Sequence, residues 1–322
     1  MRAIIFGILV SSVATAAMAA DERTLPRLAV TQPQSFGWIE GGWSSIGMAN
    51  THAFDASPTG TGDPVRPVFF KADNAAYGRA EVGIGTSGLG LIHTISVYGN
   101  YRGGSKDAQQ GLEPGDIVAL GYRNPSTDPA VVATALAPQT MRATQKFNLL
   151  DGQVRLKHNA GNTTVSIEPF VAQIRRDVFA DIDTIFSRGA DIKGTAFGTQ
   201  VALEQKWALH EQLEFRGRAS IGAYRMKSSG DFFFSGLTPT PITDAISKSI
   251  YGFRAGIEIG TEWKIAPGIW LGMSSGIDYW SRMPSAGLSI VTFGQPIEPL
   301  IGIEMKSFVD AYIGARLTFR AP

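Results

Sequence analysis

The chain has 322 residues, no cysteine, a formal net charge of +1, and 18% charged against 44% hydrophobic residues. The near-zero charge gives no sign of a nucleic-acid surface, and the lack of cysteine excludes disulfides and thiolate metal sites. Charged residues are fewer than the roughly 25% of ordinary soluble domains, so the composition is unusually apolar for a secreted soluble protein.

The first twenty residues have the features of a secretory signal peptide. Arg2 precedes an apolar run at 4–10, and Ala17-Met18-Ala19 forms a small-x-small cleavage site. An anchoring helix is the alternative, but an apolar core of about ten residues is short of the roughly twenty that span a bilayer. We expect 1–20 to be a cleaved signal peptide, 21–35 a periplasmic lead-in and 36–320 a single barrel domain.

From residue 36 onward the sequence repeats one pattern, in which apolar and polar residues alternate. Because successive side chains of a strand point to opposite sides, each such segment predicts a strand with one apolar and one polar face. Segment 300–319 is the clearest, with Val309, Ile313 and Phe319 in one phase and Asp310 in the other. The predicted strands are 36–48, 76–85, 91–102, 139–158, 163–174, 192–207, 213–226, 251–264, 269–279 and 300–319.

The connections between these strands alternate in length. Short turns are expected at 86–90, 159–162, 210–212 and 266–268, and long loops at 49–75, 103–138, 175–191, 227–248 and 281–299. Short periplasmic turns and long external loops are typical of bacterial outer-membrane barrels, which have an even number of strands. We therefore predict an all-β, transmembrane, antiparallel up-and-down β-barrel of about ten strands in the outer membrane of a two-membrane bacterium.

Two segments complicate this interpretation. The apolar piece 117–122, inside loop 103–138, could pair with a partner and add two strands, or fold inward as part of a loop. At Leu149-Leu150 the apolar phase changes from odd to even positions. This change indicates a β-bulge or, alternatively, a turn at Asp151-Gly152.

The polar faces carry many charges. We expect them to line the lumen, either as a weakly anion-preferring pore or as a salt-bridge network that fills the barrel and conducts nothing. The predicted lumen residues are Arg79, Glu81, Arg102, Arg142, Lys146, Glu168, Glu204, Lys206, Glu214, Arg216, Arg218, Arg254, Glu258, Glu262, Lys264, Glu304, Lys306, Asp310 and Arg316.

Large aromatic residues lie close to the predicted short turns. Trp207, Trp263 and Trp270 are each within a few residues of one, and Phe319 ends the last strand. Tryptophan concentrates at membrane–water interfaces, so these four residues predict an interfacial girdle on the periplasmic side.

Catalytic patterns are absent from the sequence. There are four histidines, and none belongs to a His-x-Ser pair or a His-Glu-x-x-His motif, nor is there a Gly-x-Ser-x-Gly elbow. Asp181-Ile182-Asp183 is the nearest approach to a carboxylate pair, and a solvated loop explains it better. We expect no enzyme activity, no cofactor, and no catalytic, cofactor-binding or metal residues.

The segment 194–207, continuing through 213–219, resembles the strand–turn–strand of major-outer-membrane-protein-type porins, as do Tyr279-Trp280 and the closing 315–319. The resemblance covers the C-terminal part only, and Arg320-Ala321-Pro322 follow Phe319 where such chains stop at the aromatic residue. It implies passive diffusion of small solutes. An autotransporter translocator is a weaker match, because no passenger domain precedes the first strand.

These observations predict a narrow porin for ions or small solutes. The alternative is a non-conducting structural or adhesive barrel that acts through its external loops, and a barrel hydrolase is a third, weaker candidate. The expected partners are outer-membrane lipid and lipopolysaccharide, the barrel-assembly machinery, and small solutes or ions, without nucleic acid. The sequence gives no oligomeric state.

Overall fold

The computed structural model describes residues 35–48, 52–57, 66–69, 73–86, 89–112, 117–120, 131–134, 139–182, 186–235, 242–288 and 301–321, all within the unit Thr31–Pro322. The expected signal peptide at 1–20 lies outside these residues, as does the expected lead-in apart from Ser35. Among the described residues, no helix is long and apolar enough to cross a membrane.

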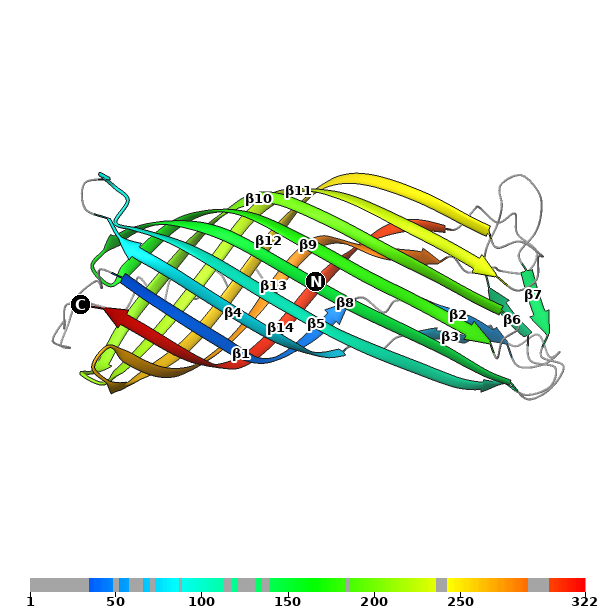
Figure 1. Cartoon of the computed structure of the whole chain (residues 1–322), viewed down its shortest axis with the longest axis horizontal. Coiled ribbons are helices and arrows are strands. Elements are labelled where there is room, and N and C mark those ends of the chain that lie inside the picture. The colour runs from blue at the N-terminus through cyan, green and yellow to red at the C-terminus, as the bar shows by residue number, and fades with distance from the viewer. Residues whose placement is uncertain are drawn as a thin grey trace, which may run out of the picture. The chain divides into compact units, whose positions relative to one another are not determined.

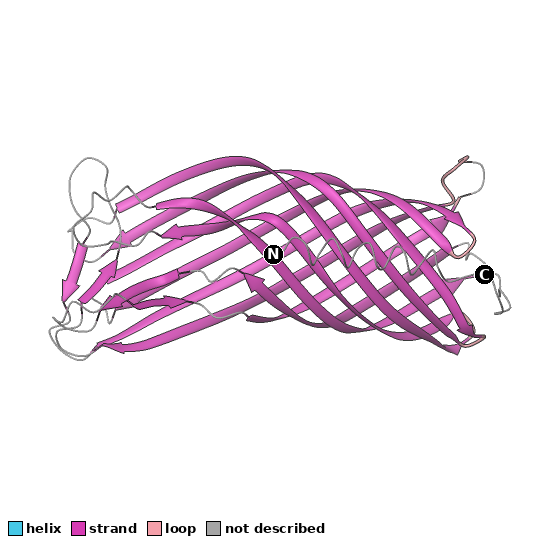
Figure 2. Ribbon diagram, turned by 180° about the vertical axis from the view of Figure 1, so that it is seen from behind, coloured by secondary structure: helices cyan, strands magenta, loops and turns pink. Residues whose placement is uncertain are grey.

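Ten antiparallel strands form a closed barrel, which confirms the predicted fold (Figures 1 and 2). Neighbours in sequence pair with each other, and β1 closes the ring between β4 and β14. The barrel strands are β1 (Ser35–Met48), β4 (Asp73–Gly85), β5 (Thr94–Leu112), β8 (Gln139–Ala160), β9 (Thr163–Ile182), β10 (Phe186–His210), β11 (Leu213–Ser235), β12 (Ile242–Ala266), β13 (Ile269–Leu288) and β14 (Ile301–Ala321).

A second, four-stranded sheet is built from the two long connections that precede β4 and β8. It contains β2 (His52–Ser57), β3 (Arg66–Phe69), β6 (Ile117–Leu120) and β7 (Val131–Thr134), in the order β3-β2-β6-β7. The apolar piece at 117–122 therefore does pair, but its partners are β2 and β7 rather than barrel strands. The barrel has ten strands, and the alternative with two more is wrong.

Tight turns join the strands at one end of the barrel, which we call the turn end; the opposite end is the loop end. β8 and β9 are separated by Gly161-Asn162, and β12 and β13 by Pro267-Gly268. Gly161 and Gly268 have φ of 61° and 73°, a backbone region that glycine enters without steric cost. At this end β5 begins at Thr94, so residues 91–93, predicted as strand, belong to the connection after β4.

Towards the loop end the strands extend well past the predicted boundaries. The loops expected at 175–191 and 227–248 are mostly strand, because β9 reaches Ile182, β10 starts at Phe186, β11 reaches Ser235 and β12 starts at Ile242. β12 has 25 residues, whereas about 9–11 tilted residues cross a bilayer. More than half of such a strand can therefore stand outside the hydrocarbon.

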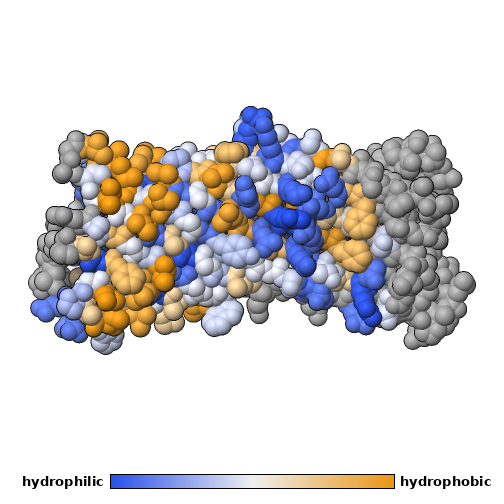
Figure 3. All heavy atoms as spheres, in the orientation of Figure 1, coloured by the Kyte–Doolittle hydropathy of each residue, from blue (hydrophilic) through white to orange (hydrophobic). Residues whose placement is uncertain are grey.

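The outer wall changes character along the strands. Figure 3 shows hydrophobic residues gathered towards the turn end and many hydrophilic residues beyond them. We call the first zone the apolar belt, and its exposed side chains include Val82, Ile84, Val97, Val154, Ile167, Val201, Leu203, Ile221, Ile259, Leu271, Met273 and Ile313. An outward apolar band of this kind is the pattern of barrels that stand in lipid.

The pairing of β8 continues without a register shift through Leu149 and Leu150, so the predicted bulge is wrong. Odd positions point inward along the whole strand. Near the loop end Phe147 is buried and Lys146 is exposed, because the outer wall is polar there and apolar side chains join polar ones inside. The environment of each face changes while the phase stays constant.

Candidate functional site in the barrel interior

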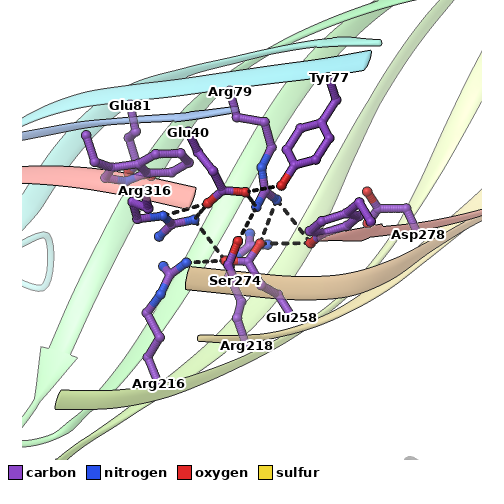
Figure 4. A network of polar contacts seen from close by, with 12 residues as sticks. Glu40, Tyr77, Arg79, Glu81, Arg216, Arg218, Glu258, Ser274, Asp278 and Arg316 are labelled. Atoms are coloured by element: carbon purple, nitrogen blue, oxygen red, sulfur yellow. Dashed lines mark hydrogen bonds and ion pairs between the residues drawn. The ribbon is translucent and has the colours of Figure 1, made fainter. Parts of the chain in front are cut away.

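Charged side chains from many strands meet inside the turn-end half of the barrel. At the centre, Arg79 Nη1 lies 2.7 Å from Glu258 Oε2, and Arg316 Nη2 lies 2.6 Å from Glu40 Oε2. Arg79 also pairs with Glu40, and Arg216 with Glu258. Figure 4 shows these acids and arginines converging from β1, β4, β11, β12 and β14.

Two further acids extend this cluster. Glu81 accepts from Arg155 at 2.6 Å and from Lys157 at 2.5 Å, which joins β4 to β8. Glu168 accepts from Arg218 at 2.5 Å, and Arg155 Nε lies 3.6 Å from the same carboxylate. The arginine thus links the two acids.

A third group of ion pairs lies closer to the loop end. Arg102 pairs with Asp310 and Asp278, and Arg254 Nη1 lies 3.0 Å from Asp151 Oδ2. We define the polar network as Glu40, Arg79, Glu81, Arg102, Asp151, Arg155, Lys157, Glu168, Glu214, Arg216, Arg218, Arg254, Glu258, Glu262, Asp278, Asp310, Arg316 and Arg320.

Aromatic rings fill spaces between these charges. The Arg316 guanidinium lies 3.8 Å from the centre of the Trp38 ring, and Arg79 lies 4.4 Å from that of Tyr312. The Tyr77 hydroxyl donates to Glu40 at 2.8 Å. Cation–π contacts are strengthened when both partners are shielded from water.

A buried apolar cluster follows the polar network in the direction of the loop end. Along β9 the order is Glu168, Phe170, Ile174, so charged residues give way to apolar ones. Arg254 joins the two layers, 4.7 Å from the Phe170 ring and 4.5 Å from the Trp280 ring. This apolar plug contains Ala75, Phe147, Leu149, Phe170, Ala172, Ile174, Ala196, Tyr224, Met226, Ile250, Trp280, Met283 and Phe308.

Most of the predicted lumen residues lie inside the barrel. Glu204, Lys206, Arg216 and Arg218 are half-buried there. The buried ones are Arg79, Glu81, Arg102, Glu168, Glu214, Arg254, Glu258, Glu262, Asp310 and Arg316.

Five predicted lumen residues lie elsewhere. Arg142 and Lys146 are exposed on the outer face of β8, beyond the apolar belt, where the outer wall is polar. Lys264 is exposed at the turn end of β12. Glu304 and Lys306 form a half-exposed pair at 3.0 Å. The register between β13 and β14 shifts between Trp280 and Met283, which is opposite the residues of β14 just after Lys306. Before this shift the inward positions of β14 change from even to odd numbers, so strict alternation from the end of the strand misplaced Glu304 and Lys306.

Several members of the polar network were missed in the sequence. Arg155 and Lys157 follow Gln153 in the inward phase of β8, opposite Val154, so alternation alone could have found them. Glu40 and the buried Trp38 point to the same side of β1. Because that side carries both an acid and a large aromatic residue, the sequence did not indicate whether it faces inward or outward. Asp278 lies between Ile277 and Tyr279 in the inward phase of β13, so alternation could have found it as well.

The predicted aromatic girdle is partly misplaced. Trp263 and Phe319 are 57% and 45% exposed on the outer wall, and Trp207 packs against Phe215 with ring centres 5.3 Å apart. Trp270 is buried, with the Arg320 guanidinium 4.3 Å from its ring centre. Its neighbours Ile269 and Leu271 occupy the outward phase, so Trp270 faces inward and its place in the girdle is wrong.

No group of three or more His, Asp or Glu that could hold a metal ion occurs among the described residues. The lack of catalytic, cofactor-binding and metal residues stays a prediction. The geometry itself shows ion pairs and packed rings that cross the interior.

Comparison with known proteins gives no family. No family model matches the chain, and no curated protein does. Among solved structures, the translocator domain of the autotransporter NalP from Neisseria meningitidis aligns with 99% of this chain and 97% of its own, at 8% identity and a TM-score of 0.39. The transport unit of the autotransporter AIDA-I from Escherichia coli covers 97% and 98%, at 11% identity and 0.35.

A FadL homologue from Pseudomonas aeruginosa covers 92% of this chain and 95% of its own, at 9% identity and a TM-score of 0.23. Scores this low carry no argument about function, and the barrel assignment rests on the strand pairing. None of these three is a major-outer-membrane-protein-type porin, so that resemblance stays a prediction from the sequence.

Proposed function

We propose that the protein is an outer-membrane β-barrel with a closed interior, which acts as a rigid support for its loop end instead of as an open pore. One observation carries this proposal: the interior is occupied at two successive levels, by the polar network and by the apolar plug. This is the non-conducting alternative that the sequence left open.

The membrane location is supported by the outer wall. The apolar belt surrounds the turn-end half, and Trp263 and Phe319 are exposed near the short turns. Short turns on the periplasmic side and longer connections outside are the rule for bacterial outer-membrane barrels. The turn end would then face the periplasm, and the extended halves of the strands would stand above the outer leaflet.

The closure is supported by barrel size and by the cross-barrel pairs. Eight strands leave an interior just filled by side chains, and sixteen to eighteen leave an aqueous channel, so ten strands belong near the filled limit. Arg79 and Glu258, from opposite parts of the strand order, meet at 2.7 Å. Phe147 and Phe308 stack in the plug at a centroid distance of 5.6 Å.

Conductance of the refolded protein in planar bilayers tests the proposal. We expect no discrete ohmic steps from the wild type, while the triple variant F147A/F308A/R102A, which thins both layers, is expected to leak. A liposome-swelling assay on the wild type gives an independent answer if the triple variant fails to refold. Regular ohmic steps from the wild type would remove the closed-barrel proposal.

The narrow porin is the second candidate. It is favoured by the charged interior, because alternating cations and anions can line an aqueous path once the plug residues move aside. Ohmic steps with a weak preference for anions in the same bilayer experiment would support it. The solutes or ions that would pass are not specified by the interior charges.

We also propose that the protein has no enzyme activity. His52 is in β2, its side chain is not among those described, and Asp183 lies outside the described residues. Hydrolysis of lipid or peptide substrates by the purified barrel would contradict this.

Contact with the barrel-assembly machinery is likewise a proposal, supported by the aromatic Phe319 at the end of β14.

A further inference from the structure

Outward cations gather on four neighbouring strands directly above the apolar belt. Arg175 of β9 is paired in register with Lys193 of β10, and Lys227 of β11 with Thr195. Arg175 and Lys193 side chains are 54% and 53% exposed, and the other members are exposed as well. We call this group the basic patch: Lys146, Arg175, Lys193, Arg225 and Lys227.

The position of the basic patch on the outer wall indicates which molecules it can contact. Arg225, the member nearest the turn end, is the register partner of the exposed Phe197, and its guanidinium lies 5.9 Å from the exposed Tyr251 ring. Aromatic side chains at the edge of an apolar wall mark the membrane interface. The patch therefore lies where the phosphates of outer-leaflet lipids would be, if the barrel stands in the membrane as proposed above.

Two of the five cations are partly neutralised by protein acids. Asp191 accepts from Lys193 at 2.9 Å and from Arg175 at 3.2 Å. Partial burial would raise the pKa of Asp191, but the hydrogen bond from Lys193 and the nearby cations hold the pKa below its ordinary value, so the acid stays charged. Among the described residues, no carboxylate lies within ion-pair distance of Arg225 or Lys227, which leaves both free for another anion.

A groove of about 740 Å³ opens on the outer wall on the loop side of the basic patch. Phe179 and Phe233 lie on either side of Gly189 in the strand register, with ring centres 6.1 Å apart. A Cβ at Gly189 would lie 2.1 Å from the Phe233 ring, so glycine is what allows the ring to lie across β10. Asp177, Asp191 and Asp231 complete the groove with carboxylates.

We propose that β8–β11 bind a phosphorylated glycolipid of the outer leaflet, with its acyl chains on the apolar belt, its phosphates on the basic patch and its sugars in the groove. Arg and Lys donate charge-assisted hydrogen bonds to phosphate. Carboxylates accept hydrogen bonds from sugar hydroxyls, and aromatic rings pack against the apolar faces of sugars. A phospholipid would satisfy the basic patch but would leave the groove empty.

Titration of the refolded full chain in detergent tests the phosphate part, with bisphosphorylated lipid A as the probe and phosphatidylglycerol for comparison. We expect R225Q/K227Q to weaken lipid A binding at least tenfold, and the matched double variant K264Q/R282Q, which removes two exposed cations elsewhere, to change it less than twofold. Added salt should weaken the wild-type interaction, because exposed charges are screened. Equal binding by both double variants would overturn the proposal.

Lipopolysaccharide with its inner-core sugars tests the groove. F233A should lose the extra affinity that this ligand has over lipid A, while binding lipid A as the wild type does. If the wild type binds both ligands equally, or binds phosphatidylglycerol as tightly as lipid A, the glycolipid assignment is overturned. Insertion into phosphatidylcholine vesicles, followed by heat-dependent gel migration, tests the membrane barrel separately, so failure here is distinguishable from failure of the proposed function.

Discussion

At the scale of single residues, Glu258 is the point where the polar network converges. Its carboxylate lies 2.7 Å from Arg79 and 3.0 Å from Arg316, pairs with Arg216, and accepts from the Tyr312 hydroxyl at 2.9 Å. Charges out of water are tolerated only when they are paired and hydrogen-bonded. One acid thus balances cations from three strands.

We expect E258Q to lower the free energy of unfolding by about 3–5 kcal/mol, because the substitution removes the carboxylate that pairs with Arg216 and one of the two that pair with the buried Arg79 and Arg316. Urea unfolding of the refolded barrel, followed by tryptophan fluorescence, measures this change. E304Q is the matched control: Glu304 is half-exposed and bound only to Lys306 among the described ion pairs, so its loss should cost at most about 1 kcal/mol. Equal stability of the two variants would show that the polar network contributes nothing beyond surface pairs.

At the scale of elements, the seam between β1 and β14 depends on close backbone approach. Gly42 is the register partner of Gly314, and a Cβ at Gly42 would lie 2.2 Å from the Ile313 carbonyl oxygen and 2.6 Å from the Gly314 Cα. The Tyr77 ring lies over Gly314 and holds Glu40 with its hydroxyl. Glycine at these two positions therefore allows β1 and β14 to pair and close the barrel. It also leaves room for Tyr77, whose hydroxyl orients Glu40.

G42A should separate the two strands and destabilise the barrel by about 1–3 kcal/mol, the usual range for overpacking. The control is G99A in β5, where an added Cβ meets nothing within 4 Å. The midpoint of urea unfolding and the fraction that refolds in detergent report both variants. A G42A protein as stable as G99A would mean that the seam is looser than its geometry indicates.

At the scale of the whole molecule, the barrel and the connections that carry β2, β3, β6 and β7 are separate in their strand pairing. Leu112, the last residue of β5, is the register partner of Gln139, the first residue of β8. These two ends are therefore adjacent across the ladder. The strands β5 and β8 therefore pair up to their ends, and the connection 113–138 is not needed to bring them together.

Replacing 113–138 with Asn-Gly, a pair suited to a two-residue hairpin turn, should leave the barrel folded. Heat-dependent gel migration and urea unfolding are expected to match the wild type, while any binding that requires the external connections is lost. Deleting 103–138 is the contrasting variant, because it also removes the second half of β5 and should impair folding. Failure of the shorter deletion to fold would show that the barrel needs this connection.

The strands of the barrel, their antiparallel order and the apolar wall could be predicted from the sequence, because alternation with a period of two is a local property of each segment. It also placed Arg79, Glu258 and Arg316 inside. It misassigned Arg142 and Lys146, and it ended two strands too early, at 174 and 226, because towards the loop end the outer wall becomes polar and many inward residues are apolar while the alternation continues.

The contents of the barrel could not be predicted from the sequence. Arg79 and Glu258 are 179 residues apart in sequence, and no local pattern indicates that they meet at the centre or that Phe147 stacks on Phe308. Such contacts exist because the ring closes and brings β4, β12 and β14 to a common axis. Whether an inward charge lines a channel or neutralises another charge depends on the side chain opposite it, and that partner is supplied by the closure of the barrel.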